Sequence, residues 1–199
     1  MKLVMATKNP NKIREASSIL DTHIISMEDA GIHNGYDESG VTYEENSMIK
    51  AVGVMNACGL PALADDSGLE IDFLQGEPGV FSSRFLGEDT PPDEKNKRIL
   101  DLLKGIPKAK RGARFVCVIS VALPDKRRFI SRGEVYGYIG YEPKGNNGFG
   151  YDPIFYLYEN GSSFAEMKPE QKNDISHRCI ALLKMKKTLI ENNIYDMLY

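Results

Sequence analysis

The alternation of apolar and polar stretches along the chain predicts an α/β protein. Apolar runs at residues 2–6 and 24–27, and a β-branched and aromatic run at 115–123, predict buried strands. Apolar residues recurring at helical spacing predict one helix over residues 10–20 and another over 43–56. Because strands and helices follow one another from the N-terminus, we expect helices packed on a sheet.

The second half of the chain continues this pattern. Asp93 is a candidate cap for a helix over residues 94–104, and the basic run at 108–114 is expected to be a solvated loop before a strand. Residues 128–139 indicate either a neighbouring strand pair or one long bent strand. A last helix is expected to follow Ser176.

Two adjacent carboxylates, Asp65 and Asp66, follow an apolar run, and Ser67 and Gly68 come directly after them. A second apolar stretch then begins, so the pattern predicts strand, tight turn and strand. Adjacent carboxylates repel each other unless a cation, a donor or water compensates them. One interpretation is a magnesium ligand or a water-activating base beside a phosphorylated substrate. The alternative is an ordinary solvated turn, because Asp-Ser-Gly is common turn chemistry.

The predicted first strand leads into the predicted first helix through a polar turn. Asn9 is a good N-cap and Pro10 a good first helical residue. Such a turn presents free backbone N–H groups to an anion, and Thr7 and Lys12 add side-chain donors. The turn is therefore either a phosphate site or a plain capped strand-to-helix turn, and it lacks the glycine pattern of a Walker loop.

The second predicted helix begins with a capping box, in which Thr42 is followed three residues later by Glu45. Lys50, within that helix, is either a solvated residue or a phosphate contact. Acidic residues near a helix N-terminus are favoured by the helix dipole, which is sufficient structural reason for them. Any of the three acidic residues here can also complete a magnesium site with Asp66, namely Glu38, Glu44 or Glu45.

Two C-terminal features suggest contacts to a ligand. Phe149 is flanked by glycines, so its ring either stacks on a planar base or is tucked into the core through a mobile turn. An N-cap at Ser176 places His177 and Arg178 in the first turn of the last helix, where cations oppose the dipole. A nearby anion, carboxylate or ligand carbonyl explains them better, and Lys172 lies just upstream.

Composition limits the class of protein. The chain has 199 residues, 42% of them apolar and 27% charged, which fits one soluble domain. A net charge of −3 gives no general attraction to nucleic acid or anionic membrane. The sequence shows no membrane-spanning stretch and no signal peptide. The three cysteines are widely spaced, so we expect reduced thiols and a cytoplasmic location.

Four motifs together resemble the inosine triphosphate pyrophosphatase family, also called XTP/dITP diphosphatases. They lie at residues 7–12, 64–69, 148–153 and 176–178, in the family's order. The resemblance implies hydrolysis of ITP, dITP and XTP to the monophosphate and pyrophosphate, with Mg²⁺ as cofactor. It further implies a single domain over residues 1–199, usually forming a homodimer. Its α/β fold would be elongated and two-lobed, with a long twisted mixed β-sheet and the active site in a cleft between the lobes.

The resemblance also implies roles for individual residues. Asp66 is similar to the family's proton acceptor and magnesium ligand, and Glu38 is the best match for the companion ligand, with Glu45 as the alternative. The N-terminal substrate contacts are then Thr7, Lys8, Asn9, Pro10, Asn11, Lys12, Lys50 and Ser67. The contacts to the nucleoside are Phe149 as the stacking ring, Gly150, Tyr151, Asp152, Lys172, Ser176, and His177 with Arg178 as readers of the base edge.

Two other functions remain open at this stage. A Maf-type nucleotide pyrophosphatase has a similar fold and would hydrolyse other nucleotides. A nucleotide- or RNA-binding module without turnover is a different class, but the absence of a basic surplus argues against RNA. Paired carboxylates facing a phosphate would also be counterproductive without a metal.

Overall fold

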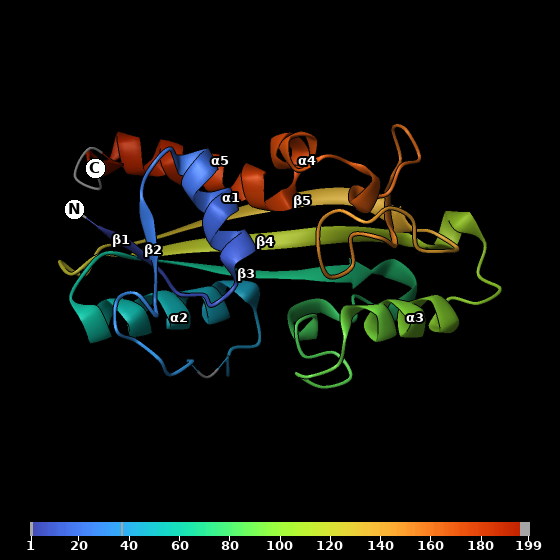
Figure 1. Cartoon of the computed structure of the whole chain (residues 1–199), viewed down its shortest axis with the longest axis horizontal. Coiled ribbons are helices and arrows are strands. Elements are labelled where there is room, and N and C mark those ends of the chain that lie inside the picture. The colour runs from blue at the N-terminus through green and yellow to red at the C-terminus, as the bar shows by residue number, and fades with distance from the viewer. Residues whose placement is uncertain (1, 37, 196–199) are drawn as a thin grey trace. The chain divides into compact units, whose positions relative to one another are not determined.

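The computed structural model describes residues 2–36 and 38–195 of the chain (Figure 1). The described residues form a mixed sheet in the strand order β2-β1-β3-β4-β5-β6. β1 pairs in parallel with β2 and β3, whereas β5 and β6 are antiparallel. This architecture confirms the expected α/β class. The strands are β1 (Leu3–Met5), β2 (Ile24–Ser26), β3 (Ala62–Ile71), β4 (Gly112–Ala122), β5 (Arg128–Ile139) and β6 (Phe155–Leu157).

α-Helices lie between β1 and β2, between β2 and β3, and between β3 and β4, and two more follow β6. No helix among the described residues is long and apolar enough to cross a membrane. The α-helices are α1 (Pro10–Leu20), α2 (Tyr43–Cys58), α3 (Pro92–Leu102), α4 (Pro169–Ile175) and α5 (His177–Glu191). Short 3₁₀ turns occur at η1 (Asp72–Leu74), η2 (Gly79–Phe81), η3 (Lys108–Lys110) and η4 (Phe164–Glu166).

The chain divides into two compact units, each built from separate stretches of sequence. Unit 1 contains Met1–Asp66, Cys117–Gly133 and His177–Tyr199. Unit 2 contains Ser67–Val116 and Glu134–Ser176.

In unit 1, successive residues of a strand point to opposite faces of the sheet. Leu3 and Met5 of β1 pack with α1 and α5, whereas Val4 packs with α2 on the other face (Figure 1). β3 alternates in the same way, since Leu63 belongs to the first cluster and Ala64 to the second. The two faces of β3 in unit 1 therefore meet different helices.

The starts of α1 and α2 agree with the predicted caps. The Asn9 side chain accepts a hydrogen bond from the backbone N–H of Asn11, and Pro10 opens α1. Thr42 and Glu45 form the capping box of α2, which ends at Gly59 in a left-handed conformation with φ of 68°. Local sequence is sufficient here because each cap satisfies helix-end groups a few residues away.

Unit 2 is built around an aromatic cluster. The Phe115 ring lies 4.5 Å from that of Phe155 and 5.7 Å from that of Phe164, centroid to centroid. Residues 128–139 form the single long strand β5, which settles the choice left open by the sequence. Gly137 of that strand has no room for a side chain, because a Cβ there would collide with the carbonyl oxygen of Tyr156.

Two expectations for this part of the chain were wrong. α3 begins at Pro92 with Pro91 in the cap position, so Asp93 lies inside the helix and not at its cap. Within the basic run, Arg111 is buried, not solvated as expected. Its Nε donates to the Ile139 carbonyl at 2.7 Å and its Nη1 to the Leu103 carbonyl at 2.7 Å. The basic run does not reveal these partners, because the two carbonyls lie outside it, 8 and 28 residues from Arg111 in the sequence.

Replacing Arg111 by Leu is expected to lower the free energy of unfolding by about 3 kcal/mol. The guanidinium also donates to the Gly140 carbonyl, so three buried acceptors lose a charged donor. Urea unfolding followed by circular dichroism measures the change. Lys110→Leu, one residue earlier at an exposed position, is the matched control. A midpoint for Arg111→Leu equal to that of Lys110→Leu would show that these hydrogen bonds contribute nothing net.

Candidate active site

The adjacent carboxylates Asp65 and Asp66 lie within one continuous strand, so the predicted tight turn was wrong. β3 runs unbroken from Ala62 to Ile71 between β1 and β4. Both side chains are buried, at 2% and 6% exposure. Strand alternation sends them to opposite faces: Asp65 to the face that packs with α1 and α5, and Asp66 to the face that packs with α2.

Asp65 is the centre of a buried ion-pair cluster in unit 1. Its Oδ2 accepts from Arg178 Nε at 2.7 Å and from the Cys117 thiol at 3.1 Å, and Lys12 pairs with its Oδ1. Arg178 also pairs with Glu15 at 2.5 Å. Burial alone would raise the pKa of Asp65, but Arg178 and Lys12 outweigh it and hold that pKa well below its usual value. Asp65 is therefore a fixed counter-charge for two cations.

Asp66 has a different environment on the opposite face. Lys50 donates to Asp66 Oδ1 at 2.6 Å and to Glu38 Oε1 at 2.8 Å, so one ammonium bridges the two carboxylates. Burial raises the pKa of Asp66 above its usual value, although Lys50 acts in the opposite direction. The second oxygen, Oδ2, is buried and has no hydrogen-bond partner among the described residues. Asp66 therefore retains one uncommitted oxygen.

A pocket of about 230 Å³ brings together several predicted substrate contacts of unit 1. The lining also includes residues that the sequence did not suggest, such as Met27 and Tyr36. Three lysines line it, and two of them are paired with carboxylates of the same lining, Lys12 with Asp65 and Lys50 with Glu38. The predicted residues in its lining are Thr7, Lys8, Lys12, Glu38 and Lys50, with Asp65 beside them.

The other N-terminal residues of the predicted site form the cap of α1. The Thr7 hydroxyl accepts from the Asn9 backbone N–H at 3.1 Å, and Asn9 Oδ1 accepts from the Asn11 backbone N–H at 2.9 Å. Pro10 is the first residue of the helix. The strand-to-helix turn therefore has the capped geometry expected of it, and a capped turn presents helix-end N–H groups.

The two companions of Asp66 that the family resemblance implies lie in different environments. Glu38 shares the Lys50 ammonium with Asp66. Glu45 instead accepts from the backbone N–H of Val41 at 2.7 Å and completes the cap of α2. The geometry therefore favours Glu38 over Glu45 as the acidic partner.

In unit 2, the Phe149 loop is held by a buried ion pair. Asp152 Oδ2 accepts from the Phe149 backbone N–H at 2.8 Å and from Lys172 Nζ at 2.6 Å. The Nζ atom of Lys172 lies 4.7 Å from the centroid of the Phe149 ring. Lys172 comes from α4, a helix that the sequence did not predict. The ring itself is half-buried. Because Asp152 binds the Phe149 backbone N–H and pairs with Lys172, these two residues fix the loop that carries the ring.

The remaining predicted residues have mostly buried side chains. Tyr151 is buried, and its hydroxyl donates to the Ser82 carbonyl at 2.8 Å. Ser176 is the C-cap of α4, and Ser67 is half-buried within β3. His177 and Arg178 open α5 as expected, with 5% and 1% of their surface exposed.

A family model described as the Ham1 family matches residues 3–188. The chain belongs to the Ham1 family. It is 43% identical over 191 residues to a Geobacter sulfurreducens protein named dITP/XTP pyrophosphatase, covering 94% of this chain and 96% of the relative. It is 42% identical to a Bacillus subtilis protein of the same name, with the same coverage of both chains.

Solved structures of Ham1 proteins have the same fold as this chain. The Staphylococcus aureus Ham1 protein matches with a TM-score of 0.87 at 36% identity, covering 96% of this chain and all of the other. A Coxiella burnetii HAM1 protein matches with the same TM-score at 38% identity, covering 96% of this chain and 99% of the other. The α/β fold implied by the sequence motifs is therefore confirmed.

The sequence did not suggest that Glu15 and Cys117 belong to the ion-pair cluster of this Ham1 chain, nor that Asp65 is the counter-charge of Arg178 and Lys12. Reading residues 62–71 as one strand would have separated Asp65 from Asp66 by face, since strand positions alternate. No local signal identifies Glu15 or Cys117, because each meets this cluster only through contacts remote in sequence.

Proposed function

We propose that this Ham1-family chain hydrolyses ITP, dITP and XTP to the nucleoside monophosphate and pyrophosphate, removing deaminated purines from the nucleotide pool. The observation that carries the proposal is the buried Asp66, which has one oxygen without a hydrogen-bond partner and shares the Lys50 ammonium with Glu38. Lys50 and Glu38 line the pocket of unit 1. The names of the two relatives, dITP/XTP pyrophosphatase, support the same substrates.

In the proposed reaction, the oxygen of a water molecule forms a bond to the α-phosphorus as the α–β bridging bond breaks. Pyrophosphate leaves with the electrons of that bond. Asp66 accepts the proton lost by the water, acting as general base. Lys12 and Lys50 hold the phosphate chain through charge-assisted hydrogen bonds, and the capped turn of α1 supplies further donors from Thr7 and Asn9.

The carboxylates of unit 1 fit a hard divalent cation, for which we propose Mg²⁺. Asp66 offers a buried oxygen without a hydrogen bond. The Lys50 ammonium lies between the carboxylates of Asp66 and Glu38 and pairs with both. The described residues contain no cluster of three or more His, Cys, Asp or Glu side chains suited to a metal. Mg²⁺ is commonly held by one or two carboxylates together with substrate phosphates and water. When bound, Mg²⁺ would neutralise phosphate charge and orient the attacking water.

We assign recognition of the base to unit 2 and to the start of α5. Phe149 supplies stacking that does not depend on base identity. We assign contacts with the nucleoside to Asp152 and Lys172. We assign reading of the base edge to His177 and to Arg178, whose guanidinium also pairs with Asp65 and Glu15. A guanidinium only donates hydrogen bonds, so it favours the 6-keto oxygen of hypoxanthine and xanthine over the 6-amino group of adenine.

We further propose that the chain works as a single domain and as a homodimer in the cytoplasm, without nucleic acid as a partner. The net charge of −3 supports the last point. A family model that matches one stretch, residues 3–188, supports a single functional domain.

Release of pyrophosphate across a panel of nucleoside triphosphates tests the proposed function. We expect Mg²⁺-dependent release from ITP, dITP and XTP at rates far above those from ATP and GTP. Turnover restricted to other nucleotides would instead support a Maf-type activity. Tight nucleotide binding without any release would support a binding module.

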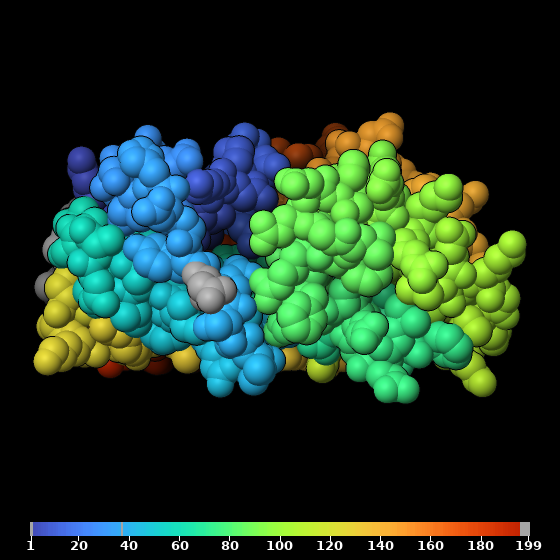
Figure 2. Space-filling view, turned by 90° about the horizontal axis from the view of Figure 1, so that it is seen from below, coloured from blue at the N-terminus to red at the C-terminus, as the bar shows by residue number. Residues whose placement is uncertain are grey.

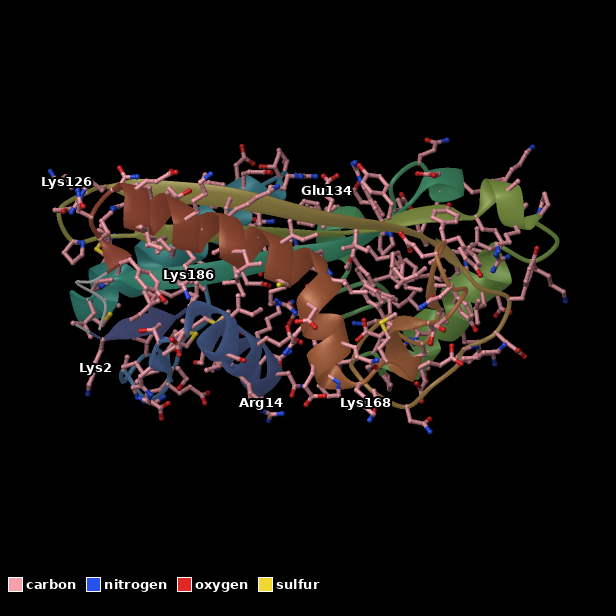
Figure 3. The ribbon with its side chains drawn as sticks, turned by 90° about the horizontal axis from the view of Figure 1, so that it is seen from above. Lys2, Arg14, Lys126, Glu134, Lys168 and Lys186 are labelled. Carbon is pink, nitrogen blue, oxygen red and sulfur yellow. The ribbon has the colours of Figure 1, made fainter. Side chains whose placement is uncertain are left out.

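Replacing Lys12 by Ala is expected to lower kcat/KM for ITP about tenfold or more, because a charge-assisted contact to phosphate is lost. Steady-state kinetics measure the change. Arg14→Ala is the control, since Arg14 lies on the same helix and points away from it into solvent (Figure 3). A kcat/KM for ITP in Lys12→Ala equal to that in Arg14→Ala would show that Lys12 does not bind phosphate.

Arg178→Lys is expected to lower turnover of ITP more than that of ATP, narrowing their ratio by about tenfold or more. Lysine keeps a positive charge for Asp65 and also only donates, but it lacks the planar pair of donors, so we expect it to bind a keto oxygen less strongly than the guanidinium does. The ratio of kcat/KM for the two nucleotides is measured. Phe149→Ala serves as the comparison, since loss of stacking should weaken both nucleotides together. An unchanged ratio in Arg178→Lys would overturn the base-reading role of Arg178.

A further inference from the structure

Besides the contacts of Asp152 and Lys172, two hydrogen bonds join the loop that carries Phe149 to the rest of unit 2. We propose that Ser82 and Asn96 are positioning residues, which hold this loop so that the Phe149 ring is preformed for stacking on the base. The proposal rests on the proposed function, because it concerns how that function's base contact is held in place. Nothing in the local sequence around either residue suggests the role.

Asn96 holds the backbone of the loop directly. Its side chain projects from α3, is 3% exposed, and donates from Nδ2 to the Gly150 carbonyl at 3.0 Å. Gly150 follows Phe149 immediately and has a φ of +63°, a conformation that favours glycine. Asn96 therefore fixes a backbone carbonyl one residue away from the stacking ring.

Ser82 holds the loop through Tyr151. The Tyr151 hydroxyl donates to the Ser82 carbonyl at 2.8 Å in a buried environment. The Ser82 hydroxyl in turn accepts from the Leu69 backbone N–H at 2.9 Å and donates to the Gly79 carbonyl at 2.6 Å. The hydrogen bonds of the Ser82 side chain to Leu69 of β3 and to Gly79 thus fix the position of the Ser82 carbonyl. That carbonyl holds the Tyr151 hydroxyl, and through it the loop.

These contacts come from a surface segment of unit 2 that the proposed reaction does not otherwise use. The stretch around 79–87 and α3 lie within the green region of Figure 2, which forms much of the visible face of unit 2. α3 is joined to this stretch, because Lys95 donates to the Ser83 carbonyl at 2.5 Å. Ser82 and Asn96 thus act from one connected support.

The backbone of the loop needs such support. Gly148 has a φ of +75°, and a Cβ at that position would collide with the Asp152 carboxylate. A segment with glycines on both sides of the ring has many alternative conformations when it is released. Each buried hydrogen bond that is removed lets the loop sample them, and nucleotide binding must then order the loop again.

The expected consequence is a loss of affinity confined to ligands that carry a base. Tyr151→Phe and Asn96→Ala each remove one buried hydrogen bond, so the Kd for IMP should rise about fivefold in each. Ser82→Ala should raise it by a similar factor, and Ser82→Thr, which keeps the hydroxyl, should restore it. The Kd for inorganic tripolyphosphate, which has no base to stack, should stay unchanged in all four variants.

Isothermal titration calorimetry with IMP and with tripolyphosphate, both in the presence of Mg²⁺, tests the proposal on the full chain. Tyr158→Phe and Lys97→Ala are matched controls at exposed positions. The double variant Ser82→Ala with Tyr151→Phe should weaken IMP less than the product of the two single effects, since both act through one contact.

Two results would overturn the proposal: an unchanged Kd for IMP in Tyr151→Phe and Asn96→Ala, or equal weakening of IMP and tripolyphosphate. The second result would indicate general loosening of the protein. Neither bears on the proposed function, which fails separately if the wild-type chain releases no pyrophosphate from ITP.

Discussion

Asp66→Asn is expected to abolish release of pyrophosphate from ITP while nucleotide binding largely survives. Asparagine has the shape of aspartate and still accepts a hydrogen bond from Lys50, so the surroundings of β3 are preserved. It is a poor base and a weaker ligand for a cation. A general base contributes about 10²- to 10⁴-fold to a rate, so kcat should fall at least about a hundredfold.

Two measurements check this prediction, pyrophosphate release at saturating ITP and the Kd of ITP for the variant. Asp101→Asn is the matched control, because Asp101 lies on an exposed position of α3. Thermal unfolding establishes that both variants are folded. Normal pyrophosphate release by a folded Asp66→Asn protein would exclude Asp66 from the chemistry, whatever its effect on binding.

Arg178→Ala is expected to lower the free energy of unfolding by about 3–5 kcal/mol, because it leaves a buried carboxylate without its main counter-charge. Arg178 is 1% exposed, and its guanidinium pairs with Asp65 and Glu15. Asp65 would keep Lys12 as a partner, which limits the loss. The effect is larger than that expected for any surface ion pair, since those contribute about 0–1 kcal/mol.

Urea unfolding of the variant measures this loss, with Lys187→Ala on the exposed side of α5 as control. The double variant Asp65→Ala with Arg178→Ala should be less destabilised than the sum of the single variants, because neither charge is then left alone. A loss within about 1 kcal/mol for Arg178→Ala would mean that the cluster adds little to stability. Base selectivity is therefore best tested with Arg178→Lys, which keeps the charge.

How much of the site could be predicted differs from residue to residue. Lys12, Lys50 and Glu38 were selected from sequence, and they line one pocket of unit 1. The helix caps at Asn9 and Thr42 were also predicted correctly. The turn proposed for Asp65 to Gly68 was wrong, because turn-forming residues were given more weight than the buried strand on either side.

The environment of Arg178 shows why the other contacts of the site could not be predicted from sequence. Sequence placed this cation at the start of a helix and predicted a nearby anion, carboxylate or ligand carbonyl to explain it, without naming which residue supplies it. The structure supplies two protein carboxylates, one from β3 and one from α1. Ion pairs between residues so far apart in sequence leave no periodic signal.

The sequence by itself determined the caps of α1 and α2, most of the helices and strands, and the chemistry available to this Ham1 chain. Capping residues and apolar periodicity act within a few positions, so they specify helices and strands without the rest of the fold. Only the tertiary structure decided which charges meet. Alternation along β3 sends Asp65 and Asp66 to opposite faces, but which helix covers each face depends on packing of distant segments. That packing makes Asp65 a counter-charge and leaves Asp66 with an uncommitted oxygen.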